Sequence, residues 1–177
     1  MRCDEIWMST RQLAALVALA ASTNSRPGDV MEIGVWQGRS AIYLANAVWP
    51  TTFHAVDHWL GSSDMPEPIK ARDNFGIFRR NVIEKTRGNI HIHKTSWQEL
   101  ARIWKTPLRF LHLDAEHTQE EVAGQIAAFR PFISCGVIAG DDYNWSGVRR
   151  GILEHWPEDS VHTLEDKLWW VNVGDDT

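Results

Sequence analysis

The sequence predicts an α/β fold: a mostly parallel sheet of seven strands, covered by helices on both faces, with an antiparallel last strand. Segments typical of strands and of helices alternate through five rounds before a final hairpin, and parallel neighbours need such crossover connections. Polar residues or glycines directly follow the apolar runs, at the edge of the sheet where ligands bind. Because the 177 residues contain no repeat or linker, we expect one domain over residues 1–177.

Caps and turn residues set the expected bounds of the elements. Ser9 and Gln12 have the spacing of a capping box, and Pro50 ends the second helix. The segment 58–68, rich in Gly, Ser and Pro, is typical of a loop, whereas "NIHIHKT" alternates as a strand does. The predicted strands are residues 30–35, 52–57, 89–95, 109–114, 135–142, 160–164 and 168–173. The predicted helices are residues 9–22, 39–48, 71–85, 96–104, 118–133 and 146–156.

Composition and charge exclude several classes of function. The net charge of −5 argues against a nucleic-acid binder, and the basic stretch 69–87 is interpreted as a solvated helix face. Cys3 and Cys135 predict neither a disulfide framework nor a zinc site. The opening residues lack the apolar core of a signal peptide, and the run 13–21 is shorter than a membrane span. We therefore expect a cytoplasmic protein without a membrane partner. Its ten tryptophans favour packing in the core or at an interface, and with the small size of the chain they are compatible with a homo-oligomer.

The first strand and the turn after it read "VMEIGVWQGRS", residues 30–40. Trp36 stands where a dinucleotide-binding fingerprint has its second glycine, and its indole would obstruct a pyrophosphate. Gly34 and Gly38 still permit a tight turn, and the next helix offers amide hydrogens to a carboxylate. Asp57, 19 residues after Gly38, has the spacing of an acid that binds both ribose hydroxyls. A nucleoside with an amino-acid tail meets these conditions, and S-adenosylmethionine is such a molecule.

Four motifs follow one another in the sequence: "EIGVWQGRS", "VDHWLG", "LDAEHTQEEV" and "VIAGDDYNWSGV". In this order and spacing they resemble the class I S-adenosylmethionine-dependent methyltransferases. Within that class the chain looks closest to the metal-dependent O-methyltransferases of the macrolide-sugar and catechol types. The resemblance covers roughly residues 30–150. It implies a Rossmann-like three-layer α/β/α sandwich and a single S-adenosylmethionine-binding methyltransferase domain.

The resemblance also implies a cofactor pocket at the strand ends. The family's matching acid, Glu32, belongs to that pocket, although a carboxylate here can equally order the glycine turn through backbone amides. Ser40 holds the methionine tail or caps its helix. Trp97 binds the rim of the adenine or merely packs at a helix start. The residues expected to bind the cofactor are Glu32, Gly34, Gly38, Ser40, Asp57, His58, Ser96, Trp97 and Asp114.

Asp114, Asp141 and Asp142 form the most informative set of polar residues. Three carboxylates at adjacent strand ends repel one another, and they stay ionised together when a cation is present. Oxygen ligands suit a hard divalent ion, so we expect Mg²⁺, and the related enzymes have metal ligands at these positions. The ion would lower the pKa of a substrate hydroxyl. A cap or turn role for Asp141 or Asp142, or a metal-free enzyme, remains an alternative.

A general base is expected close to these acids. His117 stands three residues after Asp114 and is favoured over Glu116, because a histidine accepts a proton near neutral pH. The alternative for His117 is a cap at the start of a helix without a catalytic part. The histidines within strand runs, His91, His93 and His112 among them, are expected to be structural.

The resulting hypothesis is an S-adenosylmethionine-dependent, Mg²⁺-dependent O-methyltransferase that acts on a hydroxyl of a small molecule or sugar. Two alternatives use the same fold: an enzyme that cleaves S-adenosylmethionine, and a non-catalytic module that binds it. Trp36 disfavours a nicotinamide-dependent enzyme. The related sugar-modifying enzymes carry extra amino-terminal helices and lid segments, whereas this chain has one helix before its first strand. We therefore expect a lid formed by residues 61–75, a neighbouring subunit over the site, or a large acceptor.

Overall fold

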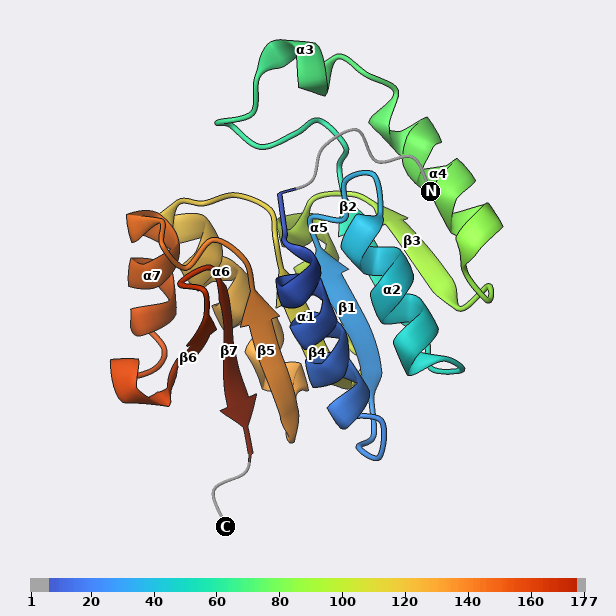
Figure 1. Ribbon diagram of the computed structural model, residues 1–177. Helices are drawn as coiled ribbons and strands as arrows, with labels where there is room; N and C mark the ends of the chain where they lie inside the picture. The colour runs from blue at the N-terminus through green and yellow to red at the C-terminus, as the bar shows by residue number, and fades with distance from the viewer. Residues whose placement is uncertain (1–6, 175–177) are drawn as a thin grey trace.

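The computed structural model describes residues 7–174, which form a seven-stranded sheet in the order β3-β2-β1-β4-β5-β7-β6 (Figure 1). Strands β1 to β5 are parallel, and β7 is antiparallel to both β5 and β6. This confirms the predicted fold class. The strands are β1 (Asp29–Ile33), β2 (Phe53–Asp57), β3 (Ile90–Lys94), β4 (Leu108–Leu113), β5 (Gly136–Gly140), β6 (His162–Leu164) and β7 (Leu168–Val173). Cys3, for which we expect neither a disulfide nor a role as a zinc ligand, lies outside the described residues.

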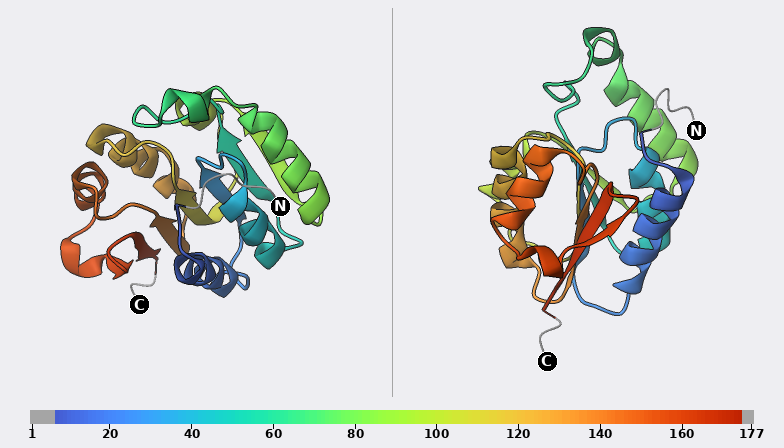
Figure 2. Two further views of the ribbon diagram at one scale, coloured as in Figure 1. Left: turned by 45° about the horizontal axis from the view of Figure 1, so that its top comes forward. Right: turned by 60° about the vertical axis from the view of Figure 1, so that its left-hand side comes forward.

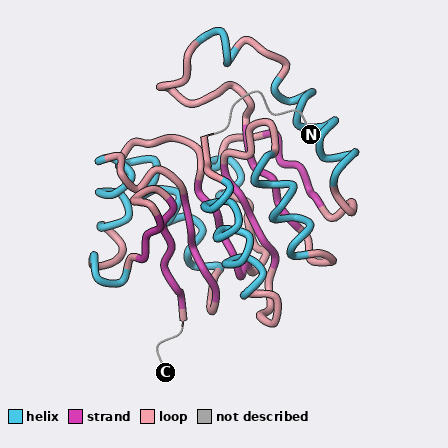
Figure 3. Tube along the Cα trace, in the orientation of Figure 1, coloured by secondary structure: helices cyan, strands magenta, loops and turns pink. Residues whose placement is uncertain are grey.

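Helices cover both faces of the sheet, as the edge-on view in Figure 2 and the tube in Figure 3 show. The helices are α1 (Thr10–Ser22), α2 (Arg39–Val48), α3 (Glu67–Lys70), α4 (Asn74–Lys85), α5 (Trp97–Ala101), α6 (Gln119–Phe129) and α7 (Ser146–Leu153), with 3₁₀ turns η1 (Arg130–Phe132) and η2 (Glu158–Ser160). α1, α2 and α4 lie against one face, and α5, α6 and α7 lie against the other. No helix within residues 7–174 is long and apolar enough to cross a membrane.

Two apolar clusters hold these three layers together. The first joins α1, α2 and α4 to the sheet and includes fully buried Leu16, Phe53 and Phe110. The second joins the sheet to α5, α6 and α7 and includes Phe129 and Trp169. Each fully buried side chain of this size contributes about 1.5–3 kcal/mol relative to its exposed state. The central strands β1 and β4 are buried on both faces, as expected for parallel strands that are covered twice.

Local caps explain where the helices begin and end. The predicted capping box is present, since Ser9 Oγ accepts from the Gln12 amide at 3.1 Å and Gln12 Oε1 accepts from the Ser9 amide at 2.8 Å. Helix α4 begins after Asp73, three residues later than predicted, because the Asp73 carboxylate accepts a hydrogen bond from the Gly76 amide. Helix α6 ends at Phe129, just before Pro131, whose ring nitrogen has no proton to donate. Helices α5 and α7 are also shorter than predicted.

Candidate functional site

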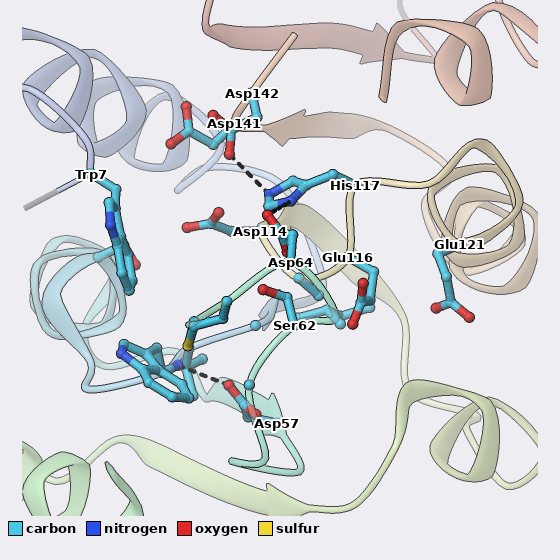
Figure 4. A pocket seen from close by; sticks show the side chains of 18 of the residues that line it. Trp7, Asp57, Ser62, Asp64, Asp114, Glu116, His117, Glu121, Asp141 and Asp142 are labelled. Carbon is cyan, nitrogen blue, oxygen red and sulfur yellow. Dashed lines mark hydrogen bonds and ion pairs between the residues drawn. The ribbon is translucent and has the colours of Figure 1, made fainter. Parts of the chain in front are cut away.

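A cavity of about 610 Å³ opens at the carboxyl ends of the parallel strands (Figure 4). Its size lies within the range of small-molecule sites, about 300–1,000 Å³. Asp57 at the end of β2 lies on one side of it, and Asp114, Asp141 and Asp142 lie on the other. Residues that are far apart in the sequence therefore face one cavity, as expected for the carboxyl edge of a parallel sheet.

The first turn is shaped by two glycines in left-handed conformation. Gly34 has φ +91°, and a Cβ placed on it would lie 1.9 Å from the carbonyl oxygen of Asp114, so no larger residue fits there. Gly38 has φ +88° and packs against the Phe78 ring. Between them Trp36 adopts φ 45°, and its side chain lines the cavity at the position where a pyrophosphate would need a glycine. The expected tight turn is therefore present.

Asp57 fixes this turn in place. Its Oδ2 accepts from the Trp36 amide at 2.9 Å, and its Oδ1 accepts from the Trp59 amide at 2.5 Å. The indole of Trp59 in turn donates to the Trp36 carbonyl at 2.7 Å. Burial raises the pKa of Asp57, against the effect of its backbone hydrogen bonds. The carboxylate thus lies at the junction of the β1–α2 turn and β2, facing the cavity.

The three aspartates of the predicted set converge. One carboxylate oxygen from each of Asp114, Asp141 and Asp142 lies within 4.8 Å of the other two. Asp141 Oδ1 is buried and has no hydrogen-bond partner among the described residues. Burial, reinforced by the charge of Asp141, raises the pKa of Asp114 to about 8. Burial and the charge of Asp142 also raise the pKa of Asp141. Burial and mutual repulsion thus disfavour simultaneous ionisation of the three carboxyls.

Two cationic groups border the aspartates. Lys167 Nζ, from the β6–β7 turn, lies 3.3 Å from Asp141 Oδ2 and 3.4 Å from Asp142 Oδ1. His117 Nε2 lies 3.0 Å from Asp142 Oδ2. Although burial opposes the charged form, the hydrogen bond and the charge of Asp142 raise the pKa of His117 to about 9. Burial likewise opposes ionisation of Asp142, but His117 and Lys167 outweigh it and lower the pKa of that carboxyl.

The segment 61–66 closes over this region and contacts both candidate bases. Glu116 accepts hydrogen bonds from the amide of Ser63 at 2.8 Å and from its hydroxyl at 2.7 Å. His117 Nδ1 lies 3.2 Å from Asp64 Oδ2. Gly61, Ser62, Asp64, Met65, Pro66 and Ile69 all line the cavity. Of the three arrangements expected for covering the site, the structure therefore contains the lid from the chain itself.

Most of the predicted site residues line the cavity: Gly34, Ser40, Asp57, His58, Trp97, Asp114, Glu116, His117, Asp141 and Asp142. Thr118, not His117, caps α6, and Gly38, not Ser40, is the N-cap of α2. Asp142 has φ 59°, and its carbonyl accepts from the Trp145 amide, so its backbone forms a turn while its side chain faces the cavity. Trp97 donates to Glu121 at 2.6 Å.

Three predicted cofactor residues do not line the cavity. Glu32 is fully buried inside the sheet, where its Oε1 lies 2.8 Å from His112 Nδ1. Gly38 lies behind the turn, and Ser96 caps α5 by accepting from the Glu99 amide at 3.3 Å. Although burial opposes it, the hydrogen bond of Glu32 raises the pKa of His112. The structural role expected for His112 is thus that of a partner to Glu32.

The structure adds residues that the sequence analysis missed. Lys167 contacts the acidic cluster, and Asp64 contacts His117. Trp7 lines the opposite wall of the cavity, with its ring centroid 6.5 Å from that of Trp36. Lys167 lies in the turn of a terminal hairpin, and no local signal distinguishes it from a solvent-exposed lysine. For Asp64, its place in the Gly/Ser/Pro-rich part of the expected lid is a usable signal.

Comparisons with known proteins agree with this arrangement. A family model described as "Methyltransferase domain" matches residues 31–143. No curated protein matches the chain. Among solved structures, cofactor-bound Rv0187 from MTB is 17% identical with a TM-score of 0.69, covering 97% of this chain and 84% of that one. CalS11, a calicheamicin methyltransferase, is 16% identical with a TM-score of 0.70, covering 93% and 79%.

A third similar structure is the O-methyltransferase from Bacillus cereus in complex with SAH, 18% identical with a TM-score of 0.68, covering 94% of this chain and 82% of that one. At these identities the likeness concerns the fold, and it confirms the predicted Rossmann-like architecture. The family match covers both the glycine turn and the ends of β2, β4 and β5, where the cavity lies. The chain therefore belongs to the methyltransferase domain family, and it is a methyltransferase.

Proposed function

We propose that the protein transfers the methyl group of S-adenosylmethionine to a hydroxyl oxygen, with a divalent ion such as Mg²⁺ held by Asp114, Asp141 and Asp142. The observation that carries this proposal is the convergence of three carboxylates in the same cavity as Asp57. One side of the cavity then serves the nucleoside and the other serves the acceptor. The solved structures of similar fold include complexes with SAH and with SAM, which supports this cofactor.

On the cofactor side, Asp57 is the proposed ribose ligand. Its carboxylate faces the cavity from the end of β2, at the usual place for an acid that accepts from two hydroxyls. His58 and Trp97 line the neighbouring wall, where an adenine ring would lie. Ser40 lies in the first turn of α2, whose free amide hydrogens favour the carboxylate of the methionine tail.

On the acceptor side, the donor set fits Mg²⁺. It consists of carboxylate oxygens alone, and the unpartnered Oδ1 of Asp141 is free to bind an ion. Without a cation, burial keeps the pKa of Asp114 near 8, so the full charge of the set does not develop at neutral pH. When bound, the ion would lower the pKa of the acceptor hydroxyl and stabilise the alkoxide.

His117 is the proposed general base, in preference to Glu116. Both carboxylate oxygens of Glu116 accept from Ser63, whereas His117 lies directly beside Asp142. The pKa of His117 falls from about 9 once the charge of Asp142 is compensated, which makes its Nε2 available to take the hydroxyl proton. The acceptor oxygen then forms a bond to the methyl carbon while the C–S bond breaks, and the sulfonium becomes a neutral thioether.

The walls of the cavity support a ring-shaped acceptor. Trp7, Trp36 and Trp145 all line it, and the Trp145 ring lies with its centroid 4.5 Å from that of His117. Indole faces stack on aromatic rings and on the apolar faces of sugars. A structure of CalS11 is described as a TDP-rhamnose 3'-O-methyltransferase, which supports a glycosyl hydroxyl as one class of acceptor.

A metal-independent methyltransferase is the second candidate, and Lys167 favours it. Its ammonium group lies within 3.4 Å of both Asp141 and Asp142 and compensates part of their charge. In that version Lys167 takes the place of the ion, and His117 alone activates the hydroxyl. Enzymes that cleave S-adenosylmethionine, and modules that only bind it, are separated from both candidates by their products: a cleaving enzyme releases no S-adenosylhomocysteine, and a module turns over nothing.

The experiment combines calorimetry with product analysis on the purified chain. S-adenosylhomocysteine is titrated into the protein, and its release from S-adenosylmethionine is measured with a panel of catechols and nucleotide sugars, in Mg²⁺ and in EDTA. Asp57→Ala should lose about 10- to 100-fold in cofactor affinity, the value of one charge-assisted hydrogen-bonded group. Asp142→Ala should retain the affinity and lose turnover. Glu120→Gln, an exposed change on α6, is the matched control.

Two results would contradict the proposal. No binding of S-adenosylhomocysteine at millimolar concentration removes the cofactor assignment, and turnover that is equal in Mg²⁺ and EDTA supports the Lys167 version instead. A reversed pattern, in which Asp142→Ala loses the cofactor and Asp57→Ala loses only turnover, would invert the two sides of the cavity. Circular dichroism confirms that each variant is folded before its activity is interpreted.

A further inference from the structure

A second cluster of ionisable side chains lies away from the cavity, on the two strands at one edge of the sheet. His54 is on β2, and His91 and His93 are on the edge strand β3. The register pairs His54 with His91 and Val56 with His93, so the three rings project from one face of the sheet. None of the three lines the cavity. One ring nitrogen from each lies within 4.8 Å of the other two.

We propose that His54, His91 and His93 bind a divalent transition-metal ion, with zinc as the occupant. Imidazole nitrogen is a preferred ligand of zinc, and three histidines leave the fourth tetrahedral position to water. The site is independent of the proposed methyl transfer, because it shares no residue with the cavity. Its consequence is a cross-link between β3, an edge strand, and β2.

The hydrogen bonds around His54 bring one ring nitrogen of His54 next to one ring nitrogen of His93. His54 Nε2 lies 3.0 Å from Asp29 Oδ2, and a carboxylate only accepts, so this nitrogen carries the proton. His54 Nδ1 is then an acceptor, and it lies 3.0 Å from His93 Nε2. Two nitrogens that share a tetrahedral zinc at about 2.0–2.1 Å lie about 3.3 Å apart. The present separation is about 0.3 Å shorter than that, so an ion that displaces the shared proton would lie off the line between the two nitrogens, and the rings would turn and move apart slightly to face it.

Asp29 supplies the support that zinc-binding histidines ordinarily have. A carboxylate that accepts from the distal nitrogen of the imidazole fixes its tautomer and orientation, and raises its basicity as a ligand. The Asp29–His54 contact has this form, and Asp29 is held at the start of β1, next to β2. Trp104 packs edge-on against the His54 ring at a centroid distance of 4.7 Å, which limits rotation of the ring.

His91 completes the set from the solvent side. Its ring stacks on that of His93 at a centroid distance of 4.5 Å and an interplanar angle of 24°. Helix α5 has five residues and leaves this part of β3 uncovered, so His91 is exposed and an ion can enter. Burial lowers the pKa values of His54 and His93, which favours the neutral imidazole that binds metal. The residues that alternate with them, Ile90 and Ile92, pack into the core.

The test titrates zinc chloride into the chelator-treated full chain and follows the heat, and then repeats the titration with cobalt chloride and records the visible spectrum. Wild type should bind one zinc ion at this site, and its Co²⁺ form should show the intense d–d absorption of a tetrahedral site. His93→Ala should weaken zinc binding by more than about 100-fold, and Asp29→Ala should weaken it by about 10- to 100-fold. Zinc should raise the thermal midpoint of wild type, since the three histidines come together only in the folded state.

Controls separate this site from other ligands on the chain. His91 is exposed, so His91→Ala should leave the fold intact, and it should abolish the thermal effect of zinc even where His93→Ala folds poorly. His162→Ala removes an exposed histidine of β6 outside the cluster and should bind zinc as wild type does. The proposal is overturned if wild type and His91→Ala bind zinc equally. It is also overturned if Asp141→Asn, rather than His91→Ala, abolishes binding, or if the Co²⁺ spectrum is weak and octahedral.

Discussion

Replacing Glu32 by leucine tests how strongly the sheet depends on a buried pair. Glu32 and His112 have no exposed surface, and their Oε1 and Nδ1 atoms are 2.8 Å apart. Removing one partner of such a pair costs about 3–5 kcal/mol, because the other stays desolvated. Because His112 can release its proton and so avoid an uncompensated buried charge, we expect the loss in the free energy of unfolding to lie at the lower end of this range, about 3 kcal/mol. With a urea m-value of about 2 kcal/mol/M, the unfolding midpoint should fall by about 1.5 M.

The assay is urea unfolding followed by the fluorescence of the ten tryptophans. The double variant Glu32→Leu/His112→Leu should recover most of the loss, because an apolar pair of similar volume replaces the ionic one without leaving a polar group unpaired. Glu84→Leu, an exposed change on α4, should stay within about 0.5 kcal/mol of wild type. A single variant within about 1 kcal/mol of wild type, or a double variant no more stable than the single, would refute the reasoning.

The same variant also separates two roles of Glu32. Its carboxylate does not line the cavity, yet the family resemblance assigns the matching acid to the cofactor pocket. Titration of S-adenosylhomocysteine into folded Glu32→Leu decides between them. The loss of one hydrogen bond to a charged group lowers affinity by at least about tenfold. A fall in S-adenosylhomocysteine affinity larger than this would therefore assign the Glu32 carboxylate to the pocket as well.

Two further predictions concern the acidic side of the cavity. The pKa of His117 is raised to about 9 in the metal-free protein, so its contribution to stability is full below the unfolded value of 6.5 and is lost as pH rises through about 9. In EDTA, the thermal midpoint of wild type should therefore fall more steeply from pH 7 to 9.5 than that of His117→Gln, and equal slopes would contradict the assignment. Lys167→Met removes the ammonium group that competes with Mg²⁺ for Asp141 and Asp142. Calorimetry should therefore show Mg²⁺ binding about tenfold tighter, because one partly screened ion pair at 3.3–3.4 Å has an interaction energy of that order. Unchanged or weaker Mg²⁺ binding would show that the lysine does not occupy the ion's place.

Much of the architecture follows from local sequence signals. The alternation of "NIHIHKT", the capping box of Ser9 and the stop at Pro50 each depend on neighbouring residues, so their elements are found at the predicted places. The acids after β4 and β5 could be expected to meet, because the carboxyl ends of adjacent parallel strands lie together. The strand order that places β4 beside β5 follows the family resemblance and not any local pattern.

Contacts between distant segments were beyond sequence reasoning. Lys167 reaches Asp141 only because β7 pairs antiparallel with β5, a pairing that brings the terminal hairpin over the cavity. The contact of Asp29 with His54 likewise depends on the register of β1 against β2. Glu32 was predicted to serve the cofactor or the turn, and its partner His112 becomes visible only when β4 lies beside β1.

Ser63 and Asp64 connect the segment that covers the cavity, residues 61–66, to the two candidate bases, Glu116 and His117. Ser63 binds Glu116 and Asp64 contacts Nδ1 of His117, so a displacement of segment 61–66 would break both contacts together. Nε2 of His117 faces Asp142 and not this segment, so the segment holds the imidazole from the side opposite to its proton-accepting nitrogen. The backbone that covers the cavity thus also sets the orientation of the proposed base.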